Sequence, residues 1–315
     1  MKKLILLLIF ILLGNCKETE TEIESEFHPK AIVIIRVGDV RAGGKPLALT
    51  QEISDQDVIT VGPKSLCDLQ ILDSDSLVVI RLKENSKFRL SGKQLKSQKV
   101  TNFIIEAGNT MLNVSKLGKN DAVNAVSPVS TVGVRGTKYD LNVSPNGNTK
   151  INVIEGTVAM KVRIPELEKY SKSDVKKSKT LSTVNNSLNS KEIIIKKGQS
   201  SEMPKAVGSK ILKETGLEKA ITKNDSRELD RNIDTKDLSE KLEKIKNEDL
   251  KIPIKEIDKS VMSQRLKEYS ELTPIEKEKI NDKSKRNGII QSRFKKWEKS
   301  WFEKVLDWGK KKLKF

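Results

Sequence analysis

The strongest constraint on the fold is a series of short apolar runs between Ala31 and Ile164, separated by glycine and polar turn residues. The runs are rich in Val, Ile and Leu and often alternate with polar residues, which is the two-residue period of a half-buried β-strand. None of them has the length and the 3.6-residue period of a helix. The sequence therefore predicts a mainly β domain, built as a sandwich, a roll or a solenoid.

Turn signals support this prediction. Asn146-Gly147 lies between two strand patterns, and Asn-Gly suits the positive φ angles of a hairpin turn. Two stretches also resemble each other, residues 103–114 (FIIEAGNTMLNV) and residues 151–162 (INVIEGTVAMKV). Both are predicted to run strand, glutamate, glycine, strand.

The pattern changes at two places further along the chain. Residues 165–192 are dominated by Ser, Lys and Asn without apolar periodicity, which predicts a mobile insertion. Residues 193–197 return as one more strand, so the β domain is expected to span residues 31–203. Residues 204–315 are helical in pattern with thin apolar faces, and we expect a separate, loosely packed α-helical C-terminal region.

One helix of that region has strong end signals. In Thr273-Pro274-Ile275-Glu276, the threonine can cap a helix, the proline suits the first turn, and the glutamate lies three residues after the cap. Gly288 is a plausible stop signal. The pattern predicts a helix between these two points.

The first fifteen residues predict export. Residues 1–15 contain two lysines and then an apolar run from residue 4 to residue 13. The run has about half of the ~20 residues that span a bilayer. A basic start, a short apolar stretch and a small-residue exit are typical of a secretory signal peptide.

The residue at the exit adds an anchor. Leu-Gly-Asn-Cys, ending at Cys16, resembles a bacterial lipobox, in which the signal is cut before a cysteine that receives acyl chains such as palmitate. Asn15 departs from the usual Gly, Ala or Ser and resembles the relaxed lipoboxes of spirochaete lipoproteins. We expect lipid on Cys16 and an acidic tether over residues 16–30. The alternative is an ordinary signal peptide with an incidental cysteine.

The charge balance indicates anionic partners. The net charge is +17 and 33% of residues are charged. Such a balance in a cytoplasmic protein suggests nucleic acid, but an exported chain does not meet it, and no nucleic-acid partner is expected. The expected partners are then anionic lipid, a cell-wall polymer or an acidic envelope protein. The alternative is that the lysines only solvate helices.

The order of the β motifs resembles a FecR-type domain. Residues 54–92 are similar to its first half, with an Asp before Val-Ile-Thr-Val-Gly and then two Ser-led strands. Residues 127–143, 149–162 and 193–199 are similar to its second half, with a Val-Arg-Gly-Thr corner, a Glu-Gly hairpin and a closing Lys-Gly-Gln strand. The resemblance covers residues 31–203, interrupted by the insertion.

This resemblance implies a β-rich envelope domain. The family is best known in membrane regulators that relay signals from an outer-membrane transporter to a sigma factor. Such a regulator crosses the inner membrane and keeps a cytoplasmic tail, and this sequence shows no spanning segment after the signal. The resemblance therefore implies fold and compartment, and we do not extend it to sigma-factor control.

The corner between two strand patterns is a structural candidate. Gly133 and Gly136 allow the chain to turn or bulge, and Thr137 restarts a strand. Arg135 lies between the glycines, where it either pairs with an acidic neighbour such as Glu155 or contacts a ligand. We expect the structural role.

Catalytic patterns are missing from the sequence. With one histidine and two cysteines, the chain has no metal-ligand spacing. It has neither a G-x-S-x-G nor a P-loop pattern. Cys67 lies on the apolar face of a strand and is expected to be a buried, inert thiol. We predict a non-enzyme that needs no cofactor and no metal.

The C-terminus holds all three tryptophans of the chain. Residues 286–315 contain ten Lys or Arg and three acidic residues, a net charge of +7. An aromatic stripe beside lysines is typical of a helix that lies on a membrane, or the helix docks on the β domain. The stripe at helical spacing consists of Phe294, Trp297, Trp301, Val305 and Trp308.

Two functions follow as expectations. The first is a non-catalytic, membrane-anchored envelope lipoprotein with a FecR-like binding or signalling domain. The second is a surface-exposed lipoprotein that binds host or environmental ligands through its basic C-terminal region. An outer-membrane location is favoured over the inner membrane, and the sequence leaves the face of the membrane open.

Overall fold

The computed structural model describes residues 24–72, 74–95, 98–115, 117–134, 136–221, 225–245 and 249–312, with side chains from Ser25 to Glu303. The predicted signal peptide and Cys16 lie outside the described residues. Within the described ranges, the chain forms a two-sheet β domain followed by helices, which confirms the predicted fold class.

Two sheets make up the β domain. Every pair of neighbouring strands in the described residues is antiparallel, except the parallel pair β10–β11. Sheet A contains β1 (Glu24–Ser25), β3 (Val40–Ala42), β4 (Lys45–Pro46), β6 (Val58–Val61), β9 (Lys87–Leu95), the first half of β10 (Gln98–Val114), β11 (Asp121–Val126), β12 (Ser130–Val134), β15 (Thr157–Val162) and β16 (Ile193–Lys196). Sheet B contains β2 (Ala31–Val37), β5 (Glu52–Ile53), β7 (Leu66–Ile71), β8 (Val78–Leu82), the second half of β10, β13 (Lys138–Val143), β14 (Thr149–Glu155), β17 (Gln199–Met203) and β18 (Ile254–Glu256).

Strand β10 belongs to both sheets. Its first half pairs with β9 and β11, and its second half pairs with β8 and β13. The register shifts between Ile105 and Ala107, and Gly108 follows with φ of +88°. A Cβ on Gly108 would lie 2.5 Å from the Cα of Ser86, so no other residue fits without a shift of the backbone. The strand bends there and passes from one sheet to the other.

This bend corrects one sequence expectation. Residues 103–114 are one continuous bent strand, whereas β14 and β15 form the predicted strand–Glu–Gly–strand hairpin. The reason is that both halves of β10 are hydrogen-bonded to other strands on both sides. The glycine therefore bends the strand without reversing it.

The inward faces of the two sheets form one apolar core. Phe88 of β9 and Phe103 of β10 contribute rings whose centroids lie 6.3 Å apart. The predicted inward face of β13 is confirmed, because Tyr139, Leu141 and Val143 are all buried. Cys67 is buried in the same core, where burial raises the pKa of its thiol far above the usual range.

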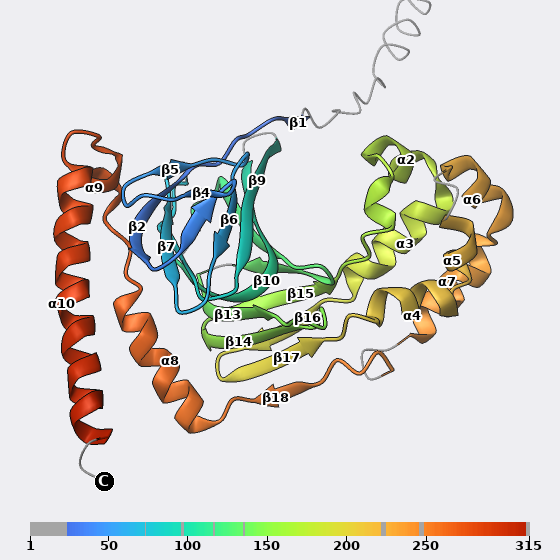
Figure 1. Ribbon diagram of the computed structural model, residues 1–315. Coiled ribbons are helices and arrows are strands. Elements are labelled where there is room, and N and C mark those ends of the chain that lie inside the picture. The colour runs from blue at the N-terminus through green and yellow to red at the C-terminus, as the bar shows by residue number, and fades with distance from the viewer. Residues whose placement is uncertain are drawn as a thin grey trace, which may run out of the picture.

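A helical lobe stands beside sheet A (Figure 1). It combines elements from two parts of the chain. They are the insertion between β15 and β16, with η1 (Leu167–Lys169), α2 (Lys172–Lys177) and α3 (Lys179–Ser190), and the helices after β17, with α4 (Val207–Glu214), α5 (Leu217–Ala220), α6 (Ser226–Asn232) and α7 (Thr235–Lys244).

The prediction of a mobile insertion at residues 165–192 is therefore corrected. Leu181 and Val184 of α3 are buried in the same cluster as Leu238 of α7. The N-terminus of α3 is also capped from outside, since Asp230 of α6 accepts hydrogen bonds from Ser178 and from the backbone of Thr180. The insertion has a thin apolar face of its own, and the later helices cover it.

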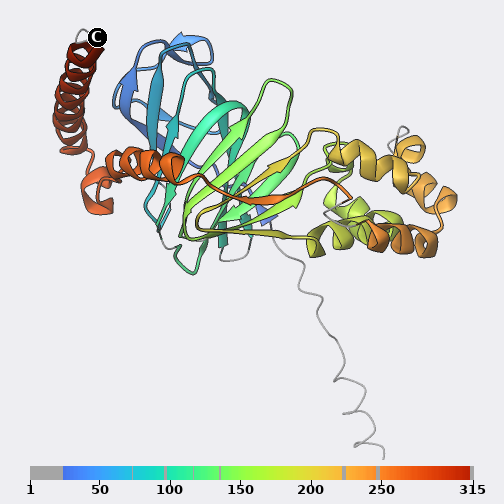
Figure 2. The ribbon, with the colours of Figure 1, turned by 90° about the horizontal axis from the view of Figure 1, so that it is seen from below.

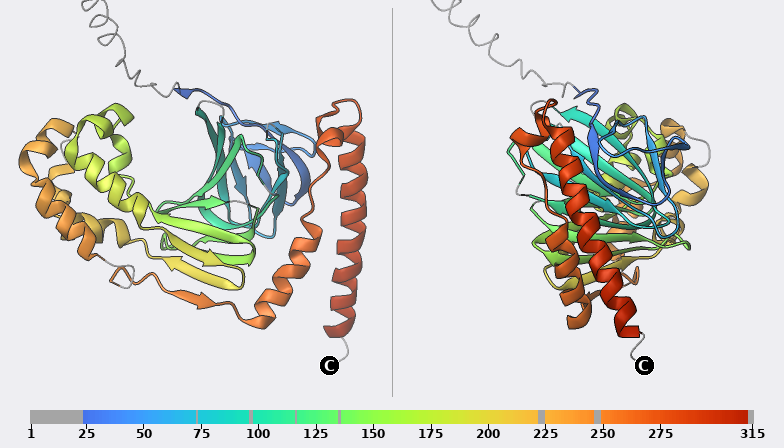
Figure 3. Two further views of the ribbon diagram at one scale, coloured as in Figure 1. Left: turned by 180° about the vertical axis from the view of Figure 1, so that it is seen from behind. Right: turned by 60° about the vertical axis from the view of Figure 1, so that its left-hand side comes forward.

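The last helices cover the opposite side of the domain. They are α8 (Lys259–Glu271), α9 (Lys277–Asn281) and α10 (Arg286–Lys312). Figure 2 shows α10 and the helical lobe at opposite ends of the molecule, and Figure 3 shows α8 and α10 on the same side of the β domain. A second apolar cluster joins these helices to sheet B and comprises Ile32, Ile34, Val79, Met111, Ile154, Tyr269, Leu272, Ile275, Ile280 and Ile290.

The predicted helix start at Thr273 is wrong. The side chain of Gln70 on sheet B accepts a hydrogen bond from the Ile275 backbone N–H at 2.8 Å and donates one to the Ile275 carbonyl at 2.7 Å. These bonds use the backbone groups that a helix would need. Helix α9 therefore starts only at Lys277, and α10 continues through the predicted stop at Gly288.

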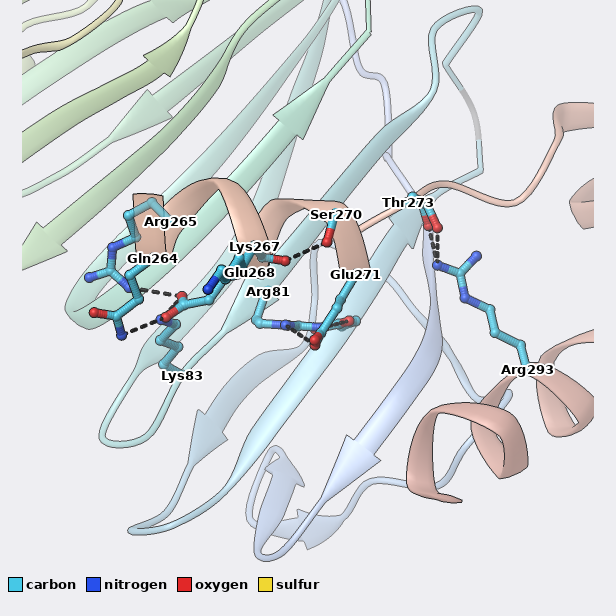
Figure 4. Close-up of polar contacts among 11 residues, drawn as sticks. Arg81, Lys83, Gln264, Arg265, Lys267, Glu268, Ser270, Glu271, Thr273 and Arg293 are labelled. Carbon is cyan, nitrogen blue, oxygen red and sulfur yellow. Dashed lines mark hydrogen bonds and ion pairs between the residues drawn. The ribbon is translucent and has the colours of Figure 1, made fainter. Parts of the chain in front are cut away.

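Polar side chains on the outer face of sheet B hold α8 in place. Asp68 and Arg81 are direct cross-strand partners and form two hydrogen bonds of 2.7 Å while nearly fully buried. Lys83 reaches Glu268 of α8 at 2.6 Å, and Glu268 also pairs with Arg265 at 2.8 Å (Figure 4). Asn113 donates to the carbonyl of Leu272 at the end of the helix.

Asp140 is the buried acid at the centre of this contact. Arg265 lies 2.7 Å from its Oδ2, and the hydroxyl of Tyr269 donates to its Oδ1 at 3.0 Å. Burial raises the pKa of Asp140 above its usual range, and the charge of Arg265 and the Tyr269 hydrogen bond oppose this only in part. The carboxyl is thus held where a proton is bound more tightly than in water.

We expect Asp140→Asn to change how stability depends on pH. A carboxyl with a raised folded-state pKa adds stability that is fully present below its unfolded pKa and is lost as the pH rises through the folded-state pKa. The wild-type chain should therefore exceed the variant in free energy of unfolding by more near pH 4 than near pH 7. Urea denaturation at the two pH values measures this difference.

Asp75→Asn is the matched control. The hydrogen bond and charge of Lys277 lower the pKa of Asp75, so its contribution to stability has the opposite sign and is lost as the pH falls. The difference in free energy of unfolding between the wild-type chain and Asp75→Asn should shrink toward acid pH. An Asp140→Asn difference that also shrinks toward acid pH, or does not change, would contradict the role of burial.

Candidate binding cleft

The outer face of sheet A and the helical lobe enclose a cleft. Its main cavity has a volume of about 480 Å³, within the range of roughly 300–1,000 Å³ that ligand sites occupy. Strands β11, β12 and β15 line one side, and the insertion from η1 to α3 lines the other. A second hollow of about 300 Å³ shares Asn124 and Gly133 with it and continues along β11.

The sheet side presents a row of small and uncharged polar residues. Ser91, Asn102, Asn124, Gly133 and Ala159 are successive cross-strand partners from β9 to β15. Their side chains form a directed chain, in which Asn102 donates to Ser91 at 3.4 Å and Asn124 donates to Asn102 at 3.0 Å. Asn124 uses its amide N–H for this bond, so its Oδ1 remains as an acceptor beside Gly133.

The helix side combines amides with an apolar surface. Asn185 and Asn189 are exposed on α3 and line the cavity together with Leu181 and Leu188. Leu181, Asn185 and Leu188 are three, four or seven residues apart and Asn189 lies four residues after Asn185, so the four share one face of the helix. The cleft therefore meets a ligand with amides and with aliphatic carbon from both sides.

Four of the five charged side chains at the cavity form two ion pairs. Lys161 lies 2.8 Å from Glu192, and Arg163 bonds Glu168 through two nitrogens at 2.5 and 2.7 Å. Arg163 also donates to the carbonyl of Ser127 at 2.9 Å. Paired charges attract an ionic ligand weakly, because each is already neutralised by its partner.

Tyr170 closes the cavity at the start of the insertion. It is only 7% exposed, and its hydroxyl has no hydrogen-bond partner among the described residues. Burial raises the pKa of Tyr170, and the charges of Asp225 and Asp174 add to this effect. The phenol is therefore neutral, and protein atoms cover its hydroxyl oxygen.

The structure separates the two glycines of the predicted corner. Gly136 has φ of +66° and forms the turn before β13. Gly133 lies inside β12 in ordinary strand geometry, and a Cβ there would meet no atom closer than 3.9 Å. Thr137 is buried and donates to the Thr157 carbonyl at 2.9 Å, which ties the turn to the next hairpin.

Arg135 itself lies outside the described residues. Glu155, which the sequence suggested as its partner, accepts a hydrogen bond of 2.6 Å from Lys138.

The aromatic stripe of α10 is partly docked and partly open. Ile290 is fully buried against sheet B, whereas Trp301 is 41% exposed and Phe302 is 54% exposed. The rings of Phe294, Trp297 and Trp301 stack along the helix at centroid distances of 6.2 and 6.3 Å. The side chains of Val305 and Trp308 lie outside the described ones.

The described residues contain no cluster of His, Cys, Asp or Glu that could hold a metal ion. None of the helices searched within those residues is both long and apolar enough to cross a membrane. What the cleft offers chemically is hydrogen bonding and apolar contact.

Sequence reasoning did not identify Asn124, Asn185 or Tyr170. A signal was present for Asn124, because residues 121–126 alternate polar and apolar residues as a strand with one solvent-facing side does. For Asn185 and Tyr170 the sequence held no such signal, since their neighbours across the cleft come from distant strands.

Comparison with known proteins supports the family expectation for part of the chain. Residues 57–159 match the family described as FecR protein. The matched range contains the strands from β6 to β14 and the start of β15, and with them most of the sheet side of the cleft. No curated protein matches the chain.

Solved structures also match, among them two that are each described as a "putative anti-sigma factor" from Parabacteroides distasonis. Both are 11% identical with a TM-score of 0.32, and the match covers 47% of this chain and 55% of the other. The chain thus spans about half the length of these structures. A similarity at this level carries no argument about fold or function.

We expect the two glycines of the corner to differ sharply on substitution. Gly136→Val places a β-branched residue at positive φ and should lower the free energy of unfolding by roughly 1–3 kcal/mol. Gly133→Val should leave it unchanged or raise it, because valine suits a strand and the cavity accepts its methyl groups. Urea unfolding of both variants compares them, and an equal loss for both would contradict this distinction.

Proposed function

We propose that this chain, which contains a FecR domain at residues 57–159, is a non-catalytic envelope lipoprotein that binds a ligand in the cleft between sheet A and the helical lobe. Lipid on Cys16 anchors it, with the outer membrane favoured over the inner. Ligand binding serves recognition or signalling in the envelope, in keeping with the family of the domain.

The cleft is the observation that carries the binding part. Its lining contains amides, hydroxyls and aliphatic side chains, but neither histidine nor cysteine. Four of its five charged residues are engaged in two ion pairs, Lys161 with Glu192 and Arg163 with Glu168. Such a site has groups that hold a ligand and lacks an activated nucleophile or a general base near neutral pH.

The anchoring part is supported by the N-terminal pattern. The short apolar run ends at Gly14-Asn15-Cys16, and the first described residues are Glu24 and Ser25 of β1. Strand β1 pairs with the end of β9 in sheet A, so the tether from Cys16 reaches the β domain on that sheet. Several acyl chains would hold the domain at a bilayer where one would not.

A second candidate function is favoured by α10. Trp301 and Phe302 are exposed large apolar side chains, and Lys295, Lys296 and Lys299 are exposed beside them. Aromatic rings interleaved with lysines on one helix suit an anionic surface. In this role the C-terminal helix is a second contact of the lipoprotein with anionic lipid or with an anionic ligand outside the cell.

Replacement of Cys16 tests the anchor. Wild-type protein from cells fed a labelled fatty acid should carry the label and enter the detergent phase. Cys16→Ala should lose both, because the thiol that receives the acyl chains is gone. Cys67→Ala is the matched control and should keep the label, since Cys67 is buried in the core. Unchanged partitioning of Cys16→Ala would contradict lipidation.

Tryptophan fluorescence tests the second candidate. All three tryptophans lie in α10, so no other signal interferes. Anionic vesicles should shift the emission of the Cys16→Ala chain to the blue, and salt should weaken the shift, because exposed charges are screened within about 10 Å at 0.1 M. Zwitterionic vesicles are the control. No shift with anionic vesicles would contradict contact of α10 with the membrane.

A further inference from the structure

We infer that the cleft between sheet A and the helical lobe binds an uncharged glycan chain of the envelope, held through Asn124 and Asn185. This inference rests on the proposed function and specifies the ligand class of the same site. The cavity of about 480 Å³ has asparagine side chains on both of its sides, Asn124 on the sheet and Asn185 on α3.

The hydrogen-bonding groups suit hydroxyl and acetamido groups. An asparagine amide both donates and accepts, as a sugar hydroxyl does. The chain from Asn124 to Asn102 to Ser91 fixes the amide of Asn124 with its Oδ1 at the cavity. Asn185 has no hydrogen-bond partner among the described residues and faces the same space from α3.

The apolar lining suits the carbon faces of sugar rings. Gly133 and Ala159 carry little or no side chain, so the sheet surface is open where they line the cleft. Leu188 and Val162 line it beside them. Flat aliphatic surface next to amides matches a pyranose ring, which has apolar faces and a polar rim. The adjoining hollow shares Asn124 and Gly133, so the site continues beyond one ring and suits an oligosaccharide.

The same features disfavour the two main alternatives. An anion would need free cationic groups, and Lys161 and Arg163 are already paired with Glu192 and Glu168. The third cationic residue of the lining, Lys172, also has an interaction partner. An extended peptide binds by adding a strand at a free sheet edge. The cleft instead presents the face of sheet A, where Asn124 and Gly133 are paired within the ladder.

Titration calorimetry with a defined sugar tests the inference. The probe is the β-1,4-linked tetramer of N-acetylglucosamine, because acetamido sugars are components of the bacterial cell wall. The full chain is used in a zwitterionic detergent, since sugar-headed detergents would compete. We expect saturable binding whose affinity changes little between low and high salt, because the site's charges are paired.

Three variants locate the binding. Gly133→Val fills the centre of the cleft and Asn124→Ala removes the fixed acceptor, and each should weaken binding by roughly tenfold or more. Asn152→Ala is the matched control, because Asn152 lies on a strand of sheet B and should bind as the wild type does. Unfolding midpoints measured in parallel show that each variant is folded.

Several outcomes would overturn the inference. Absence of binding to the tetramer is one, and binding that Gly133→Val and Asn124→Ala leave unchanged is another. A tetra-alanine peptide is titrated alongside. The glycan inference is wrong if the sugar does not bind while the peptide binds and Gly133→Val abolishes that binding. The proposed binding function would then still stand. The anchor at Cys16 is tested separately by fatty-acid labelling.

Discussion

The architecture depends on strand β10 passing from one sheet to the other at Gly108. The two halves of one strand anchor the two sheets at a fixed angle, and the inward faces then enclose a single core. A side chain at Gly108 would collide with the backbone at Ser86, so the bend is available to glycine. Because the sheets share a strand, each has one face in the core and one face left for other contacts.

The chemistry of the two outer faces decides what covers them. Sheet B carries Ile32, Ile34 and Val79 outward, and α8 to α10 bury them. Between these apolar residues, Asp140 and other polar side chains bond directly to α8 and to the segment after it. Sheet A carries Asn102, Asn124 and Gly133 outward, which gain little from burial. That face stays open to the lobe, and the cleft lies there.

The helical lobe shows how two distant segments depend on each other. The insertion presents only a thin apolar stripe, and its α3 is capped by Asp230, about fifty residues later in the sequence. Neither the packing of α3 against the later helices nor its cap by Asp230 leaves a pattern in the local sequence, so the sequence alone suggested mobility. The helix start predicted at Thr273 failed for a related reason. A local signal was present there, but Gln70, some two hundred residues earlier, bonds the backbone of Ile275.

The amino-acid sequence by itself determined the β class of residues 31–203, the inward face of β13, the helical character of the C-terminal region and the resemblance to a FecR domain. These follow from short-range periodicity, which burial of one face imposes on every strand or helix. The tertiary structure decided the bend of β10, the folding of the insertion, the docking of α8 and the position of the cleft. Each of these depends on partners far apart in the chain, such as Asn124 and Asn185 across the cleft, and local periodicity does not encode which distant surfaces meet.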